Sequence, residues 1–347
     1  MEVDFIIVGQ GLAGSALSMA LMRRGKSVAV VDSNDPSAAT RVAAGLVTTL
    51  AGKGMNQAWR QAEYLPEAIF YYQDLERESG TQLFYPHSVL RLFKDLKEVA
   101  KFGRKVDSVK EWVVADVAEI PPNQLHADFG GFEMAHGGRL DTAAYLKVVR
   151  QIIESEGLYL EQTFDEESVE LSAEGVSWNG IHAQKIILCQ GYAGLAKGRF
   201  SNLKHRSAKG EMLTVRVNQL DSERVISRNG WMVPIGDKLW RAGATYEWDD
   251  LSTNPTAEGC SEVEQKVTDL TSLPFEVVGH EVGVRPIIHR SQPVIGLDST
   301  TPQIGFFNGL GSKGVITAPS VAEHFTSYLL GESELDPELS LARVERT

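Results

Sequence analysis

The sequence predicts an α/β protein: a doubly wound sheet, assembled from three separate stretches of chain, with a second α+β domain built on a mixed, largely antiparallel sheet. Three observations predict this architecture. The first 32 residues contain a strand, a glycine-rich turn, a helix and a second strand. Residues 303–330 repeat the order of strand, glycine-rich turn and helix at the far end of the chain. Short strands with glycine-containing turns between 206 and 289 indicate antiparallel pairing.

The N-terminal unit carries a dinucleotide-binding fingerprint in its required context. The apolar run Val3–Val8 predicts a buried strand, and it ends in G-x-G-x-x-G, formed by Gly9, Gly11 and Gly14, before a helical stretch. The first glycine permits a tight turn, the second lets backbone approach a pyrophosphate, and the third lets the helix pack on the strand. Asp32 ends the second strand, where an acid accepts a hydrogen bond from a ribose hydroxyl. The unit predicts a Rossmann-like domain.

Composition excludes several classes of protein. The 347 residues carry a net charge of −12, which opposes a nucleic-acid partner. The only two cysteines, Cys189 and Cys260, cannot build a disulfide framework, and the histidine spacing predicts no metal site. Cys189 lies in an apolar run and is expected to be buried. Without a leader peptide or a transmembrane stretch, the sequence predicts a cytoplasmic protein.

The remaining elements divide the chain between two domains. Asp141 is an N-cap for a helix over 142–156, and the apolar strand 185–190 ends at Gly191, as a strand covered on both faces would. Apolar residues at helical spacing over 56–79 predict a helix pair, or one helix broken near Pro66. The first domain is assigned to 1–55, 140–205 and 290–347, and the second, substrate-binding domain to 56–139 and 206–289.

Some features remain open at this level. The small-residue stretch 40–47 fits either backbone laid against a bulky group or an ordinary helical turn on the core. Several aromatic side chains of the second domain could line a pocket, but the sequence does not say which way they face. These are Trp59, Tyr64, Trp231, Tyr246 and Trp248, together with His289.

These motifs, taken in order, resemble the D-amino-acid oxidase (DAO) superfamily of flavoproteins, which includes glycine oxidase, sarcosine oxidase and D-amino-acid dehydrogenases. The resemblance covers nearly the whole chain. It rests on the fingerprint, the stretch 40–47, Gly191 after its strand and the run 243–245. It also rests on G-V-R-P at 283–286, P-V-I-G at 293–296 and the loop 309–319 before the last helix. The resemblance implies an FAD cofactor, a two-domain fold and oxidation of an amine next to a carboxylate.

The resemblance also implies which residues bind FAD. The fingerprint would hold the pyrophosphate, Asp32 the ribose and the loop at 310–314 the pyrimidine edge of the flavin. Without a cysteine after position 260, or a histidine in the loop after Asp32, the FAD is expected to be noncovalent. The expected cofactor residues are Gly9, Gly11, Leu12, Ala13, Gly14, Asp32, Ser33, Arg41, Ala43, Ala44, Gly45, Leu46, Phe164, Gly191, Gly309, Leu310, Gly311, Ser312, Lys313 and Gly314.

Three residues are expected to act on the substrate or the reacting flavin. Arg285 matches the arginine of G-x-R-P that clamps the substrate carboxylate; otherwise it would form a strand-end salt bridge. Lys313, at a helix N-terminus, would stabilise negative charge on reduced flavin; otherwise it is a solvated lysine. Trp231 stands where relatives often have an aromatic hydroxyl. Because indole only donates hydrogen bonds, Trp231 casts doubt on a simple glycine- or D-amino-acid-oxidase pocket.

The resemblance predicts an FAD-dependent oxidoreductase that oxidises a C–N bond of a small amino or imino acid. The substrate would be a D-amino acid, glycine or an N-substituted glycine, with hydride transfer to flavin N5. Oxygen and a quinone or other compound remain open as electron acceptors. The alternatives are a flavin domain acting on a carboxymethylaminomethyl group in tRNA, and a non-catalytic or electron-transfer FAD protein.

Overall fold

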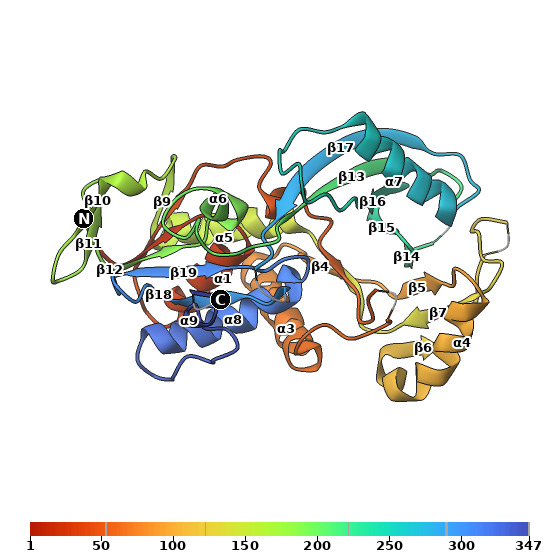
Figure 1. The fold of residues 1–347 in the computed structure, drawn as a ribbon, viewed down its shortest axis with the longest axis horizontal. Helices are drawn as coiled ribbons and strands as arrows, with labels where there is room; N and C mark the ends of the chain where they lie inside the picture. The colour runs from red at the N-terminus through yellow and green to blue at the C-terminus, as the bar shows by residue number, and fades with distance from the viewer. Residues whose placement is uncertain (53, 122, 221, 289–290, 346–347) are drawn as a thin grey trace.

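The computed structural model describes residues 1–52, 54–121, 123–220, 222–288 and 291–345. Figure 1 shows one sheet with its helices on the left and a second, curved sheet on the right, with α7 above it. The helices are α1 (Leu12–Arg23), α2 (Ala39–Val42), α3 (Gln61–Ser79), α4 (Leu96–Lys105), α5 (Thr142–Glu156), α6 (Gly191–Ala196), α7 (Ala257–Leu270), α8 (Gly314–Leu329) and α9 (Ala342–Glu345).

The first sheet has a parallel centre in the order β9-β2-β1-β12-β19. Three antiparallel strands complete it, because β11 pairs with β12, β10 with β11, and β18 with β19. All its strands come from the three stretches predicted for the dinucleotide domain. They are β1 (Glu2–Val8), β2 (Val28–Asp32), β9 (Leu158–Glu161), β10 (Val169–Leu171), β11 (Val176–Trp178), β12 (Ile181–Leu188), β18 (Val294–Leu297) and β19 (Ile304–Asn308).

The second sheet runs in the order β17-β13-β16-β15-β14-β5-β7-β6 and is antiparallel except where β14 pairs with β5. Its strands are β5 (Val89–Leu92), β6 (Val113–Ala115), β7 (Gly131–Met134), β13 (Ala208–Arg216), β14 (Val225–Ser227), β15 (Trp231–Gly236), β16 (Leu239–Gly243) and β17 (Glu276–Arg285). A small sheet, β3-β8-β4, joins Leu46–Val47, Gly138–Leu140 and Phe84–Pro86. The predicted α/β class is confirmed, while the exact domain boundaries stay a prediction.

The helix near Pro66 corrects one prediction. Residues 61–79 form a single helix, α3, that contains Pro66, and not a pair or a broken helix. Proline at 66 removes the N–H that would bond the Ala62 carbonyl, but both residues are exposed, so water can satisfy that carbonyl. Buried Tyr64, Leu65 and Tyr72 on the other face anchor the helix in the core.

Other boundaries also differ from the sequence-based ranges. The stretch 40–47 starts with the short helix α2 and continues as extended backbone and the two-residue strand β3, and its place against a bulky group stays a prediction. Strand β9 ends at Glu161, so the expected cofactor residue Phe164 lies beyond the strand. Helix α6 and strands β8 and β18 were not expected, since each is too short or too glycine-rich to show a period.

Candidate active site

The fingerprint forms a turn that only glycine fits. Gly9 has φ +100° and a Cβ there would lie 2.6 Å from the Cys189 carbonyl oxygen, while a Cβ on Gly14 would overlap the Gly9 carbonyl. Helix α1 therefore begins directly against β1 and β12. Thr40 Oγ1 accepts the Leu12 N–H at 3.1 Å, and a Cβ on Gly11 would approach that oxygen to 3.2 Å. The Thr40 side chain therefore lies beside Gly11 at the start of α1.

Asp32 is held at the end of β2 by three donors. The backbone N–H groups of Gln10 and Asn34 donate to it at 2.7 and 2.8 Å, and Arg41 Nη2 lies 3.3 Å from Oδ1. A carboxylate offers about four acceptor positions, so about one stays free for a ribose hydroxyl. A hollow of about 240 Å³ lies beside it, lined by Gln10, Arg41, Ala143, Leu146, Lys147 and Arg150.

The stretch after α2 passes close to the small sheet. Gly45 has φ +65°, and a Cβ there would overlap the Leu140 carbonyl. Val42 and Ala44 pack with Met212 of β13 and with Ala244 just after β16, and Trp231 packs against the same cluster. The predicted cofactor segment and the predicted substrate domain therefore meet at this point.

The C-terminal glycine loop lies beside Gly191 and the end of β17. Asn308 Nδ2 donates to the Gly191 carbonyl at 2.7 Å, and the Gly311 N–H donates to the Pro286 carbonyl at 3.0 Å. Gly309 and Gly311 have φ +81° and +54°. The loop is thus tied both to the first sheet and to the chain segment after Arg285.

Lys313 points back toward the stretch after α2 and is not a freely solvated lysine. Its Nζ donates to Thr48 Oγ1 at 3.2 Å and lies 3.4 Å from the Thr48 carbonyl. Burial lowers the pKa of Lys313 to about 8. Within the described residues, no carboxylate forms an ion pair with it, so a positive charge is held beside the predicted flavin segment. Thr48 was not anticipated from the sequence, because nothing local links it to residue 313.

Arg285 ends β17, and its side chain is partly buried. Its Cζ lies 4.2 Å from the ring centroid of Tyr246, and Nη1 donates to the Thr245 carbonyl at 3.3 Å. Burial lowers the pKa of Arg285, although a guanidinium stays charged at any physiological pH. Within the part of the chain that the structure describes, it has no carboxylate partner. The strand-end salt bridge expected as the alternative does not form there.

Gly210 makes space for this guanidinium. Ala208 is directly opposite Arg285 in the β13–β17 ladder, and Gly210 is directly opposite Gly283. A Cβ on Gly210 would overlap the Arg285 guanidinium. The small residues at 208 and 210 are visible in the sequence, but their purpose appears only once β17 is paired with β13.

The other predicted residues have varied surroundings. Leu12, Ala13, Leu310 and Gly314 are buried around the start of α1 and α8, whereas Ser33 and Ser312 are exposed. Phe164 lies beyond the end of β9, and its ring packs on Trp178 at 5.4 Å. Among the open aromatics, Tyr64 is in the core, Trp59 is partly buried, and His289 lies outside the described residues.

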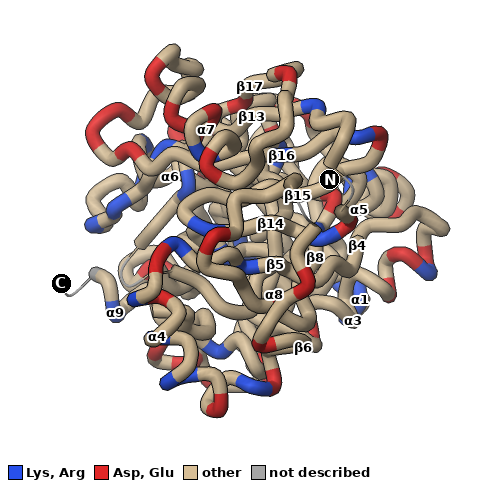
Figure 2. Tube along the Cα trace, turned by 90° about the vertical axis from the view of Figure 1, so that its right-hand side faces the viewer, with Lys and Arg blue, Asp and Glu red and all other residues tan. Residues whose placement is uncertain are grey.

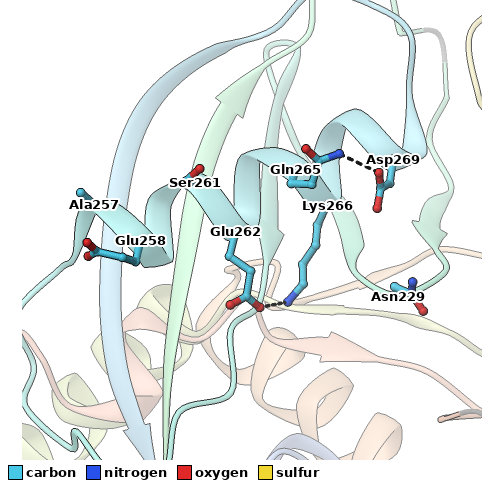
Figure 3. Close-up of a pocket in the computed structure, with 8 residues that line it drawn as sticks. All are labelled: Asn229, Ala257, Glu258, Ser261, Glu262, Gln265, Lys266 and Asp269. Carbon is cyan, nitrogen blue, oxygen red and sulfur yellow. Dashed lines mark hydrogen bonds and ion pairs between the residues drawn. The ribbon is translucent and has the colours of Figure 1, made fainter.

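A separate hollow of about 700 Å³ lies along α7. Figure 3 shows that all its lining residues except Asn229 come from α7. Lys266 in this hollow pairs with Glu262 at 2.7 Å and donates to the Ala244 carbonyl at 2.6 Å. None of the predicted site residues lines it. In the described part of the chain, no three metal-ligating side chains cluster, and no helix could cross a bilayer.

These surroundings fit FAD. The glycine cradle excludes side chains where a pyrophosphate would lie, Asp32 keeps about one acceptor position, and Lys313 holds a buried charge next to the stretch after α2. Which residues contact FAD in this protein stays a prediction. Figure 2 shows Lys and Arg interspersed with Asp and Glu on this side of the molecule.

Known proteins share this sequence and fold. The bifunctional protein ThiO/ThiG of Trichormus variabilis is 26% identical over 98% of this chain and 54% of its own length. The tRNA 5-methylaminomethyl-2-thiouridine biosynthesis bifunctional protein MnmC of Burkholderia pseudomallei is 24% identical over 98% of this chain and 58% of its own length. The chain thus spans little more than half of either relative.

Solved structures agree on the fold. Glycine oxidase from Geobacillus kaustophilus superimposes with a TM-score of 0.82 at 18% identity and covers 99% of both chains. Iminodiacetate oxidase from Chelativorans sp. BNC1 gives a TM-score of 0.79 at 20% identity, over 97% of this chain and 98% of its own. Residues 4–328 match the DAO family, described as FAD dependent oxidoreductases. The chain therefore belongs to the DAO family and is an FAD-dependent oxidoreductase.

Proposed function

We propose that this enzyme oxidises small amines that carry a carboxylate next to the reacting C–N bond, such as an amino acid or an N-substituted glycine. The observation that carries the proposal is Arg285. Its side chain is partly buried and lacks a carboxylate partner among the described residues, and the guanidinium lies against Tyr246 and Gly210. A buried charge without a counter-ion is costly, so a substrate carboxylate would stabilise it.

The chain's own residues would bind and orient the substrate. Arg285 presents a planar donor pair to the carboxylate, which fixes the direction of the neighbouring C–H and C–N bonds. Trp231 packs at the junction of α2 and the second sheet, where it supplies an apolar wall and excludes water. FAD, when bound, would supply the oxidant: it would take up one hydride from the substrate carbon, which carries both electrons, and water would then hydrolyse the released imine.

The test is to mix the purified holoenzyme anaerobically with a panel of carboxylated amines. Reduction of the flavin is measured as the loss of its visible absorbance. We expect Arg285→Gln to lower kcat/KM by roughly 10²-fold or more, because a desolvated ion pair loses one partner. The matched control is Arg216→Gln at the other end of β13, where the arginine is 40% exposed and 4.0 Å from Glu276. Unchanged reduction by Arg285→Gln enzyme would contradict the proposal. Repeating the assay in air shows whether oxygen reoxidises the reduced flavin.

The relative MnmC, named for tRNA thiouridine biosynthesis, keeps a second candidate open. A carboxymethylaminomethyl group also places an amine beside a carboxylate, so Arg285 would serve it in the same way. The net charge of −12 opposes binding to a phosphate backbone. Adding such a tRNA to the same anaerobic assay separates the two candidates, since only a free small amine would reduce the flavin under the first proposal.

A further inference from the structure

A second arginine lies on the same face of the β13–β17 ladder as Arg285. Ala208 is opposite Arg285, and the ladder continues as the Arg206 N–H donates to the Ile287 carbonyl at 2.8 Å. Because side chains alternate along extended chain, Arg206 and Arg285 share a face. As diagonal neighbours in an antiparallel pair, their Cβ atoms are about 7–8 Å apart.

Two aromatic rings connect these arginines. Glu247 bridges to Lys209 of β13 by backbone hydrogen bonds of 2.8 and 3.1 Å, so Tyr246 and Trp248 on either side of it share the opposite face. Arg285 Cζ lies 4.2 Å from the Tyr246 centroid, and the two ring centroids are 5.9 Å apart. Arg206 Cζ lies 5.1 Å from the Trp248 ring. The four groups therefore form a row in the order Arg285 guanidinium, Tyr246 phenol, Trp248 indole and Arg206 guanidinium.

The outer half of this row is open to solvent. Tyr246 is 47% exposed and Trp248 45% exposed, although large aromatic rings usually lie inside. Arg206 is exposed, and no carboxylate among the described residues pairs with it. Stacking on a ring orients a guanidinium but does not neutralise it, so its N–H donors remain available to an anion.

The segment that carries the rings is fixed from the other face of the sheet. Lys209 Nζ donates to Asp250 Oδ2 at 2.7 Å. Glu211 accepts hydrogen bonds from the Thr256 N–H and hydroxyl at 2.9 and 2.8 Å, and His280 Nε2 lies 2.8 Å from it. Lys209 and Glu211 are almost fully buried, so these contacts hold the loop in one position. The exposed rings are therefore a preorganised surface.

We propose that Arg206 and Trp248 form a second anion subsite outside the Arg285 clamp, and that the preferred substrate is a dicarboxylic amine. This rests on the proposed function: one carboxylate binds Arg285, and the second, at the end of the side chain or of the N-substituent, binds Arg206. The rings of Tyr246 and Trp248 line the path between the two cations and pack on the carbon chain of the substrate.

The test compares matched pairs of amines with the holoenzyme. Iminodiacetate is paired with N-ethylglycine, and D-aspartate with D-asparagine, and the ratio of kcat/KM within each pair is measured for the wild type, Arg206→Gln and Arg216→Gln. We expect Arg206→Gln to lower the ratio roughly tenfold and Arg216→Gln to leave it unchanged. As a readout without turnover, Kd for glutarate and butyrate is obtained from the perturbed visible spectrum of the bound flavin. The preference for glutarate should fall in Arg206→Gln.

The outcomes separate the two proposals. Wild-type enzyme that favours neither dicarboxylate, or ratios that Arg206→Gln leaves intact, would overturn the second subsite while reduction by the monocarboxylic partners continued to support the Arg285 clamp. If no amine of either kind reduces the flavin, or Arg285→Gln reacts like wild type, the proposed function fails and the subsite fails with it.

Discussion

At the scale of single residues, the Arg285 site depends on the small residues Ala208 and Gly210 in the neighbouring strand β13. The guanidinium lies flat across β13 because positions 208 and 210 carry only a methyl group and a hydrogen. The ring of Tyr246 then closes over it at 4.2 Å. Packing on both sides sets the direction of the Arg285 guanidinium. A small change in the strand beneath it, β13, should therefore move the positive charge.

Gly210→Ala tests this geometry. We expect the new methyl group to displace the guanidinium and to lower kcat/KM for carboxylated amines by roughly tenfold or more, with the larger effect on KM. Gly103→Ala is the matched control, because a Cβ there meets nothing within 4 Å and φ is ordinary. Steady-state kinetics of both variants decide the matter. Equal kinetics for Gly210→Ala and wild type would show that Arg285 is not positioned by this strand.

Lys313 should set the flavin potential in a pH-dependent way. Its pKa of about 8 means that the side chain is charged at pH 7 and loses its proton as the pH rises through 8. We expect Lys313→Met to lower the midpoint potential at pH 7 by on the order of 30 mV, equivalent to ~1.4 kcal/mol for two electrons. The gap between variant and wild type should narrow above pH 8. Spectroelectrochemistry at several pH values measures the difference in midpoint potential between Lys313→Met and wild type. A difference that does not change with pH would show that deprotonation of Lys313 does not affect the flavin.

At the scale of elements, a hydrogen bond joins α3 to α8 at a carbonyl that a proline in α8 leaves without its helical donor. Pro319 lies inside α8 and has no N–H for the carbonyl of Val315, four residues earlier. The hydroxyl of Tyr72 in α3 donates to that carbonyl at 2.8 Å, and both residues are buried. Pro66 needs no such donor, since its freed carbonyl is on an exposed residue. This contrast explains why both prolines are tolerated.

A double-mutant cycle tests the pairing. Tyr72→Phe leaves the buried Val315 carbonyl without its donor and should lower the free energy of unfolding by about 1–3 kcal/mol. In a Pro319→Ala background the restored N–H can bond the carbonyl, so we expect the same substitution to cost less. Urea unfolding of the holoenzyme at fixed FAD concentration gives the four values. If Tyr72→Phe lowers the free energy of unfolding equally in both backgrounds, the Tyr72 hydroxyl and the residue 319 N–H do not compete for the Val315 carbonyl.

At the scale of the whole molecule, the two large sheets meet where α2 lies on β17. Arg241 of β16 donates to the Val42 carbonyl and pairs with Glu281. A Cβ on Gly283 would overlap the Val42 side chain. The cofactor segment that follows α2 therefore rests directly on the sheet that carries Arg285.

The substitution Gly283→Ala tests the contact between α2 and β17. We expect it to push α2 away from β17 and weaken FAD binding by roughly tenfold, since overpacking at such a junction costs about 1–3 kcal/mol. Gly279→Ala in the same strand is the control, because a Cβ there would lie 3.3 Å from the Thr214 side chain and 3.9 Å from Glu281 Oε2 and would not touch α2. The Kd for FAD by fluorescence titration compares the two. If both variants bind FAD equally well, the junction does not shape the cofactor site.

The sequence by itself determined the class of fold, the glycine cradle and the candidate arginine. Local signals decide those features: a strand, turn and helix carry their own periodicity and glycines, and helix 142–156 begins at its Asp141 cap as predicted. The resemblance then led from the cradle to FAD, and the family match confirms it.

Only the tertiary structure decided which residues gather around Arg285. Gly210, Tyr246 and Arg206 are 75, 39 and 79 positions away from it in the sequence, and strand register alone brings them to one face. Lys313 meets Thr48 across most of the chain for the same reason. Hydrogen-bonded pairing between distant strands leaves no periodic trace in either strand, so a site built across a sheet is fixed by the register and not by the local sequence.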